Sequence, residues 1–576
     1  MREDIVVIEV RVVLAWLLLT GVFLGFGNMA RRVFWRSAPY DLMDLWWGWA
    51  GAIVVLQLWH FALPVDWRAG LVIAIVGLVG LGIGILRRDH HRLPARTIWY
   101  LAVGIVIAFW LSLHSTNQPG NCDSGLYHLN SVRWAKEYPI VPGLGNLHAR
   151  LAFNQSYFLY VALLDVGPFA HKSHQLASGL LVLWTLLKST SAVQVALRRE
   201  RRLQGWVIYD LVMIVPILHY VVSSGNISSP SPDIAIFLMG NAMASELIRV
   251  LAIGRIPDQW RQDSGVWLLI LLACVGVTVK LSFAAVAAAT CGVLLVHAWR
   301  TAGRSQAFRL VAGMLAVGAA VELPWMVRGC ILSGYPLYPV AIGRLAVDWC
   351  VPRANINRSY SLIRMWAATW GDSIPSACVG TARGYWLWLM AMLRTEKTTL
   401  VVPLAMAICS MVCGACLRRR RNGIREPGFG LLFFIVPCVG VPYWFFTAPD
   451  PRFGGAIFWM LGGGAMAFAL VQVPRRYAAI CLVLVSCLLF FHEIEIVDFI
   501  KPWEKDSGPV KTVAVVEKTT DSGLKVFVAP EKEAGRTWDS ELPSAPFFSP
   551  YVSLRVPGDM ARGFRTVEQP RPAAGW

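Results

Sequence analysis

The sequence predicts an all-α polytopic membrane protein of about fourteen transmembrane helices, followed by a small external C-terminal segment of α/β or irregular structure. Of its 576 residues, 56% are hydrophobic and 15% are charged, whereas soluble globular proteins carry roughly 25% charged residues. Apolar runs of roughly 17 to 22 residues recur along the chain, and each is long enough to cross a bilayer. After about residue 493 the composition changes to that of a charged tail. These features exclude a soluble enzyme.

Breaks at charges, prolines and polar clusters divide the apolar body, residues 1–492, into individual spans. We expect them at 12–30, 42–63, 70–86, 98–114, 176–197, 205–223, 232–252, 266–279, 281–299, 307–327, 399–417, 429–447, 454–472 and 477–492. Residues 155–170 are apolar as well, but they are short and contain Asp165 and Pro168. They therefore predict a short helix lying on or dipping into the outer membrane face.

The basic residues set the expected orientation. The chain has 53 Lys and Arg against 35 Asp and Glu. With this set of spans, every basic cluster falls on one side: residues 31–36, 87–92, 198–202, 300–309, 418–421 and 475–476. Because positive loops remain cytoplasmic, both termini are expected outside. The positive charge is thus a topology signal, and no nucleic-acid partner is expected.

Three loops are expected on the outer side, at residues 115–175, 224–231 and 328–398. Long loops tend to carry function. Cys350 and Cys378 share the third loop and could pair in an oxidising space, which the sequence leaves open. In the external segment 493–576, β-branched runs at 510–516 and 524–529 predict strands.

The first outer loop contains a candidate general base, Asp123, with His128 nearby in NCDSGLYH. A carboxylate at the membrane surface can deprotonate an acceptor hydroxyl or bind a divalent cation. Residues 124–137 have the apolar spacing of an amphipathic helix at the interface, with Asp123 at its N-terminal end. A plain N-capping role for Asp123 is therefore an equally good interpretation.

A second carboxylate, Asp233 in SSPSPD, begins a span at the outer side, where capping is again the simpler interpretation. Asp123 and Asp233 on one face could share a metal ion or divide the roles of base and orienting group. Three cations are expected on the same side, namely Lys280, Arg328 and Arg452. Each alone is typical of snorkelling to lipid headgroups, but together they could hold a phosphate or diphosphate.

These residues resemble the GT-C superfamily of membrane glycosyltransferases, which take a sugar from a polyprenyl-phosphate-linked donor at the outer face. The resemblance rests on Asp123 in NCDSGLYH, Asp233 in SPSPD, the motif PWMVRGCILSGYPLYP and the late PRF at 451–453. Most of the chain also resembles an uncharacterised bacterial family of polytopic membrane proteins. This similarity implies a multi-pass protein of the bacterial inner (plasma) membrane with its active site outside.

The GT-C resemblance implies that Asp123 is the catalytic base or metal-site acid, that Asp233 is a second acid, and that Lys280 or Arg452 contacts phosphate. His128 joins the catalytic candidates, and Tyr127, Arg328 and Tyr335 join the substrate-binding candidates. Many members have two adjacent acids in the first loop, whereas Asp123 is flanked by Cys122 and Ser124. This departure leaves open whether a divalent cation, Mg²⁺ or Mn²⁺, is required.

The expected activity is inverting transfer of a hexose or pentose from the polyprenyl-phosphate donor to a glycan, lipid or protein acceptor of the cell envelope. Two alternatives remain. An oligosaccharide polymerase or ligase would depend on Arg358, Arg364 or His148 more than on Asp123. A transporter of lipid-linked glycans without catalysis would show inverted repeats and broken helices at midplane.

Overall fold

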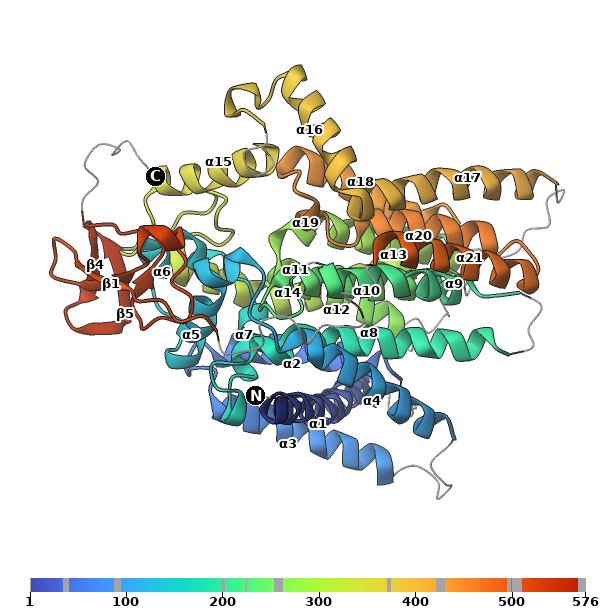
Figure 1. Ribbon diagram of the computed structural model, residues 1–576, viewed down its shortest axis with the longest axis horizontal. Helices are drawn as coiled ribbons and strands as arrows, with labels where there is room; N and C mark the ends of the chain where they lie inside the picture. Colours follow the sequence, from blue (N-terminus) through green and yellow to red (C-terminus); the bar gives the residue numbers. More distant parts are fainter. Residues whose placement is uncertain are drawn as a thin grey trace.

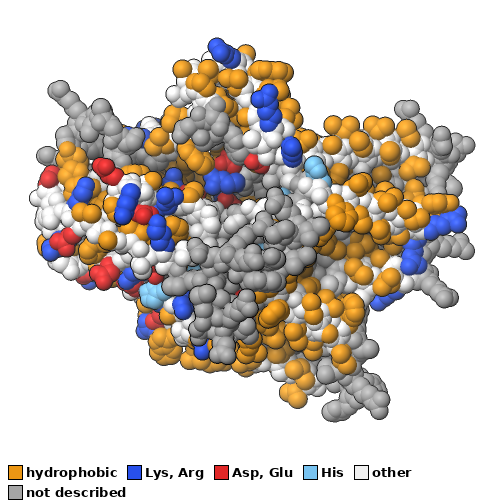
Figure 2. Space-filling model, viewed as in Figure 1, with side chains coloured by type: hydrophobic (Ala, Val, Ile, Leu, Met, Phe, Trp, Pro, Cys, Tyr) orange, Lys and Arg blue, Asp and Glu red, His pale blue; other side chains and the backbone are white. Residues whose placement is uncertain are grey.

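The computed structural model describes residues 2–34, 41–86, 95–198, 202–223, 225–252, 263–369, 374–420, 430–494, 499 and 510–567. Most of these residues are helical, and the last described stretch, residues 510–567, contains two small sheets (Figure 1). Figure 2 shows that hydrophobic side chains cover much of the helical body, whereas charged side chains gather over the C-terminal sheets and at the far end of the helices. The described surface thus matches the apolar composition of the predicted membrane body.

Ten segments among the described residues are helical, long and apolar enough to cross a membrane. They comprise α1 (Arg2–Phe34), α3 (Trp67–Leu86), α4 (Ala95–Ser115), α8 (His174–Ala196), α9 with α10 (Gly205–Val212 and Ile214–Ser223), α11 (Pro232–Ala252), α13 (Ala284–Ala302), α14 (Arg304–Ser333), α17 (Val402–Arg420) and α21 (Arg475–Glu493). Each coincides with a predicted span.

The four other predicted spans are helices of 14 to 16 residues: α2 (Asp44–Trp59), α12 (Ser264–Val279), α18 (Leu432–Thr447) and α20 (Ile457–Leu470). At about 1.5 Å per residue they measure roughly 21–24 Å, less than the roughly 30 Å of a hydrocarbon core. Nearly every residue of α20 is buried, so this helix is surrounded by protein on all sides. The total of fourteen spans therefore stays a prediction.

Glycines let the first three helices pack with their backbones in contact. A Cβ on Gly25 would stand 1.9 Å from the carbonyl oxygen of Gly77, and one on Gly27 would stand 1.7 Å from that of Asp44. Small residues at such positions are typical of helix packing in membranes, where close van der Waals contact replaces the hydrophobic effect.

The direction of the helices separates two ends of the bundle. Helix α11 starts beside Asp233 and ends near Arg249, and α12 returns to Lys280, which pairs with Asp233. We call the end with Asp233 and Lys280 the site end and the opposite one the basic end. Basic residues that lie at the basic end include Arg31 in the last turn of α1, Arg300 in the last turn of α13, Arg304 at the start of α14 and Arg475 at the start of α21.

The site end carries the shorter helices: η1 (Ser124–His128), α5 (Leu129–Glu137), α6 (Leu144–Leu147), η2 (Ala149–Ala152), α7 (Tyr157–Leu163), η3 (Gly167–Phe169), η5 (Leu281–Phe283), α15 (Arg353–Thr369), η6 (Ser376–Cys378), α16 (Ala382–Thr395), η7 (Lys397–Val401) and α19 (Pro451–Gly454). The segment expected on the membrane face differs from its prediction. All seven residues of α7 are buried, and Tyr160 packs edge-on against Trp49 of α2. The helix is short, as predicted, but it lies inside the protein because apolar neighbours cover it.

The C-terminal residues form a three-stranded sheet of β1 (Val516–Thr519), β2 (Lys525–Val528) and β3 (Ser544–Ala545), and a hairpin of β4 (Val552–Val556) and β5 (Asp559–Thr566). Strand β1 pairs antiparallel with β2, and β2 pairs parallel with β3. The predicted strand at 524–529 is confirmed, whereas only the last residue of the run 510–516 belongs to a strand.

These sheets share a second hydrophobic core with the loops of the site end. Its members come from α5 to η2, from residues 332–356 and from the sheets, and include Trp134, Leu144, Val351, Val528 and Phe564. The C-terminal segment is therefore packed onto the first and third loops. Cys350 and Cys378 are both free thiols in this structure.

Candidate functional site

Asn121 fastens the first outer loop to the second. Its side-chain Nδ2 donates to Asn226 Oδ1 at 2.8 Å, and its backbone N–H donates to Ser229 Oγ at 3.0 Å. Its side-chain oxygen accepts the backbone N–H of Asp123 at 2.9 Å. Asp123 is thereby held beside the segment that leads into α11, the helix of Asp233.

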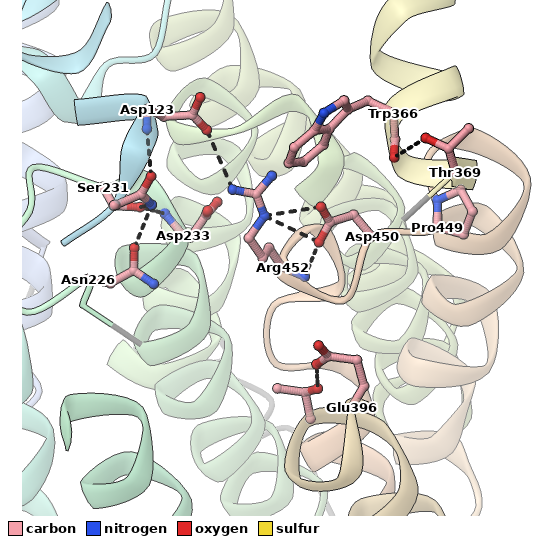
Figure 3. Close-up of polar contacts among 12 residues, drawn as sticks. Asp123, Asn226, Ser231, Asp233, Trp366, Thr369, Glu396, Pro449, Asp450 and Arg452 are labelled. Atoms are coloured by element: carbon pink, nitrogen blue, oxygen red, sulfur yellow. Dashed lines mark hydrogen bonds and ion pairs between the residues drawn. The ribbon is translucent and has the colours of Figure 1, made fainter. Parts of the chain in front are cut away.

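The carboxylate of Asp123 lies between two guanidinium groups. Arg150 Nη1 is 2.6 Å from Oδ1, and Arg452 Nη1 is 3.5 Å from Oδ2. Figure 3 shows the Asp123 carboxylate facing Arg452 across the site. The side chain makes no capping hydrogen bond to the helix that follows. The capping interpretation of Asp123 is therefore wrong, and the carboxylate is directed into a cluster of charges.

Arg452 is positioned by a short helix, α19. Asp450 precedes this helix and accepts the backbone N–H of Arg452 at 2.9 Å, and it also pairs with Arg452 Nε at 3.1 Å. The guanidinium carbon lies 5.2 Å from the centroid of the Trp366 ring, which comes from α15 (Figure 3). An ion pair on one side and an aromatic face on the other thus fix the direction of the guanidinium group.

Asp233 and Lys280 form a second ion pair, from Lys280 Nζ to Asp233 Oδ1. Lys280 lies in the extended break between α12 and η5, and its ammonium also lies 4.2 Å from the centroid of the Phe453 ring. The residue that caps the start of α11 is Ser231, whose hydroxyl accepts the backbone N–H of Asp233 at 3.3 Å. The Asp233 carboxylate thus has no capping role. The Phe453 ring contacts Arg452 as well as Lys280, because the guanidinium carbon lies 5.5 Å from its centroid.

The charges around Asp123 decide its protonation state. Burial by itself raises the pKa of a carboxyl group, but the positive charges of Arg150, Arg452 and Lys280 outweigh that effect and lower the pKa of Asp123 below its ordinary value. Burial by itself lowers the pKa of Arg452. The negative charges of Asp450, Asp233 and Asp123 outweigh this effect, so the pKa lies above its ordinary value. At neutral pH the site therefore contains an anionic Asp123 and a cationic Arg452.

Tyr127 and His128 follow Asp123 in the π-helix η1, a helix type that is frequent at functional sites. Burial lowers the pKa of His128 to about 4, so its imidazole is neutral at pH 7. Its ring lies 4.5 Å from that of Tyr127, and the Arg150 guanidinium lies 5.4 Å from the Tyr127 ring. Both predicted residues thus belong to the cluster, although His128 is too deeply buried to act as a cation.

Two predicted substrate-binding residues lie in other surroundings. Arg328 is buried, and it contacts His60 Nδ1 at 2.7 Å and Asn154 Oδ1 at 3.2 Å beside a cavity of about 40 Å³. Tyr335 belongs to the second hydrophobic core and is 1% exposed. Arg328 therefore ties α14 to α2 and to the first loop, and Tyr335 packs against the side that carries the C-terminal sheets.

Sequence reasoning missed Arg150, Asp450 and Trp366. The order Asp450-Pro451-Arg452 did carry a signal, because an acidic N-cap followed by proline is typical of a helix start. No such signal marked Arg150, because its contact with Asp123 depends on the folded path of residues 138–156.

A divalent cation at Asp123 and Asp233 would meet carboxylates that already pair with cationic side chains. Among the described residues, no group of three or more His, Cys, Asp or Glu side chains is arranged to hold a metal ion. The donor set of this arrangement does not fit Mg²⁺ or Mn²⁺ unless Arg150, Arg452 or Lys280 moves away. The requirement for a metal stays a prediction, and no step below uses one.

Comparison with known proteins gives one result that covers most of the chain. No curated protein and no solved structure matches the sequence. Residues 10–459 match a family model described as "Domain of unknown function (DUF8201)", a range that holds Asp123, Asp233, Lys280 and Arg452 and ends before the C-terminal sheets. The chain therefore belongs to this family.

Proposed function

We propose that the protein is an integral membrane glycosyltransferase that moves a sugar from a polyprenyl-phosphate-linked donor to an acceptor hydroxyl of the cell envelope. The observation that carries this proposal is the position of Asp123 between Arg150 and Arg452, beside the Asp233–Lys280 pair, at one end of a bundle of apolar helices. The resemblance of NCDSGLYH and PRF to GT-C motifs supports the same activity.

An exchange of ion-pair partners, from carboxylate to phosphate, would allow the arginines of this site to bind a phosphate. Each cation is paired with a carboxylate, so the cluster is nearly neutral without a ligand. The side chains of Arg150 and Arg452 are 41% and 28% exposed, and a donor phosphate can therefore reach both. Phosphate accepts charge-assisted hydrogen bonds as a carboxylate does. When the guanidinium groups turn to the phosphate, Asp123 loses its counter-charges and its basicity rises.

The chemical step follows from that exchange. The acceptor hydroxyl attacks the anomeric carbon and forms the new carbon–oxygen bond while its proton passes to Asp123. The bond between the anomeric carbon and the phosphate oxygen breaks on the opposite face, and its electron pair leaves with the lipid phosphate. Arg150 and Arg452 stabilise the charge that develops on this leaving group. Trp366, 46% exposed next to Arg452, offers a ring face to the sugar.

The proposed location is the outer face of a bacterial inner membrane. Basic residues including Arg31, Arg300 and Arg475 lie at the basic end, and positive loops remain cytoplasmic. The site end would then face outward, where a lipid-linked donor can enter laterally between helices.

The test compares lipid-linked and surface glycans, by mass spectrometry, from cells that carry the wild-type chain, Asp123→Asn, a deletion or the matched control Asp66→Asn. Asp66 also belongs to the site end, between α2 and α3, pairs with an arginine at 2.8 Å and has a 21% exposed side chain. It resembles Asp123, 20% exposed, in chemistry and exposure but not in position.

We expect Asp123→Asn and the deletion to lose the same sugar and to accumulate the lipid-phosphate donor, and Asp66→Asn to behave as wild type. A normal glycan profile in Asp123→Asn, at wild-type expression, would remove Asp123 from the mechanism. A profile altered only in the deletion would favour transport or a polymerase that uses other residues.

A further inference from the structure

Helix α16 presents an apolar surface that no described part of the chain covers. Its buried face consists of Gly384, Trp388 and Met392, at a spacing of four residues. Trp386, Leu389 and Leu393 are 61%, 39% and 43% exposed. At about 100° per residue these three side chains fall within roughly 60° of one another on a separate face. This face is the exposed apolar surface of α16.

Positive charge borders this surface. Arg383 and Arg394 are both exposed, and the helix contains no acidic residue. In Figure 2, blue side chains stand among hydrophobic ones on the protruding part of the molecule that α16 forms in Figure 1. An apolar face flanked by arginines is typical of helices that lie in the headgroup layer of a bilayer.

The chain path puts α16 at the level of the membrane boundary. Only Glu396 separates the helix from Lys397, where the candidate span that contains η7 and α17 begins. Figure 1 shows that α16 turns away from the axis of α17 and projects sideways from the body. If the α17 span crosses the bilayer, a helix that projects sideways from its end can lie along the surface of the leaflet.

We propose that α16 lies in the headgroup layer at the site end, with its exposed apolar surface among acyl chains and with Arg383 and Arg394 bound to the phosphates of anionic lipids. The buried face of α16 also contacts the segment that holds Arg452 in the candidate site. Trp388 on the buried face donates its Nε1–H to the carbonyl oxygen of Pro449 at 3.1 Å, and Pro449 directly precedes Asp450, the partner of Arg452. The lipid surface thus supports the segment that positions Arg452. The inference does not depend on the proposed enzymatic activity.

The test uses the full chain in nanodiscs of phosphatidylcholine with phosphatidylglycerol, with a photo-crosslinking amino acid introduced at one exposed position at a time. The test positions are Trp386 and Leu389. Val412, 60% exposed within the α17 span, is the positive control, and Val556, 46% exposed at the end of β4, is the negative control. Crosslinked lipids are identified by mass spectrometry on monodisperse protein.

We expect lipid adducts at Trp386 and Leu389 close to the yield at Val412 and well above that at Val556. Phosphatidylglycerol should be enriched among these adducts, and Arg383→Ala with Arg394→Ala should reduce the enrichment by up to about fivefold per arginine. Adducts to protein alone, or a lipid yield no higher than at Val556, would overturn the membrane contact. Enrichment that survives both arginine substitutions would overturn the headgroup assignment.

Discussion

Replacement of Arg150 by glutamine tests the electrostatic description of the site most directly. Arg150 Nη1 lies 2.6 Å from Asp123 Oδ1. With roughly 4 Å between the charge centres, Coulomb's law gives about 1 kcal/mol in water and about 4 kcal/mol at an effective dielectric constant of about 20. Because the Arg150 side chain is 41% exposed, solvent screens the pair and the lower figure applies. We expect Arg150→Gln to raise the pKa of Asp123 toward its ordinary value, because the nearest positive charge is removed.

The assay is the free energy of unfolding in mixed micelles, measured from neutral to acidic pH. A depressed pKa contributes stability that is present above the unfolded-state value, near 3.8, and that is lost as the pH falls through the folded-state value. Wild type should therefore exceed Arg150→Gln by about 1 kcal/mol at pH 7, and the difference should vanish in acid. In the Asp123→Asn background, Arg150→Gln should have no pH-dependent effect. A difference of equal size at both extremes of pH would refute the ion-pair explanation.

Three further predictions concern packing and ligand binding. Gly125→Ala should cost about 1–3 kcal/mol of unfolding free energy, because its Cβ would stand 2.9 Å from the Trp538 ring. Trp538→Ala should relieve that cost in the double variant, and additive losses would contradict the clash. Arg328→Ala should cost about 2–3 kcal/mol by leaving His60 and Asn154 without their partner, and an unchanged thermal midpoint would argue against this role. Under the proposed function, Arg452→Lys should lower sugar transfer at least about tenfold in the glycan assay, and wild-type transfer would exclude phosphate binding by the guanidinium group.

Helices were the part of the structure that hydropathy could predict. Long apolar runs dictate helical segments whatever surrounds them, so the predicted spans coincide with helices even where four of them are short. Hydropathy does not report what covers an apolar segment. Residues 155–170 therefore predicted a helix at the membrane face, whereas α7 is buried because helices that include α2, α5 and α8 pack against it.

Site residues could be predicted from the sequence only where a charged side chain stands at the end of an apolar segment. Asp123, Asp233, Lys280 and Arg452 are charges at the ends of apolar segments, and all four meet in one cluster. Arg150 follows no such pattern, because its contact with Asp123 depends on the path of an irregular loop. Tyr335 stands in a motif that suggested substrate binding, but its place in the second core follows from long-range packing that no local pattern encodes.

The second hydrophobic core has a consequence for the order in which the chain matures. Thr566 donates to Asn146, 420 residues earlier, and the Phe564 backbone N–H donates to the carbonyl oxygen of Pro142 at 2.9 Å. Trp538 likewise donates its backbone N–H to Gly125, within the π-helix that follows Asp123. During synthesis the first loop therefore lacks its hydrogen-bond partners in the C-terminal segment until β5 has been translated. A chain truncated after α21 would contain the helices α1 to α21, but its Asp123 loop would lack the support of the C-terminal sheets.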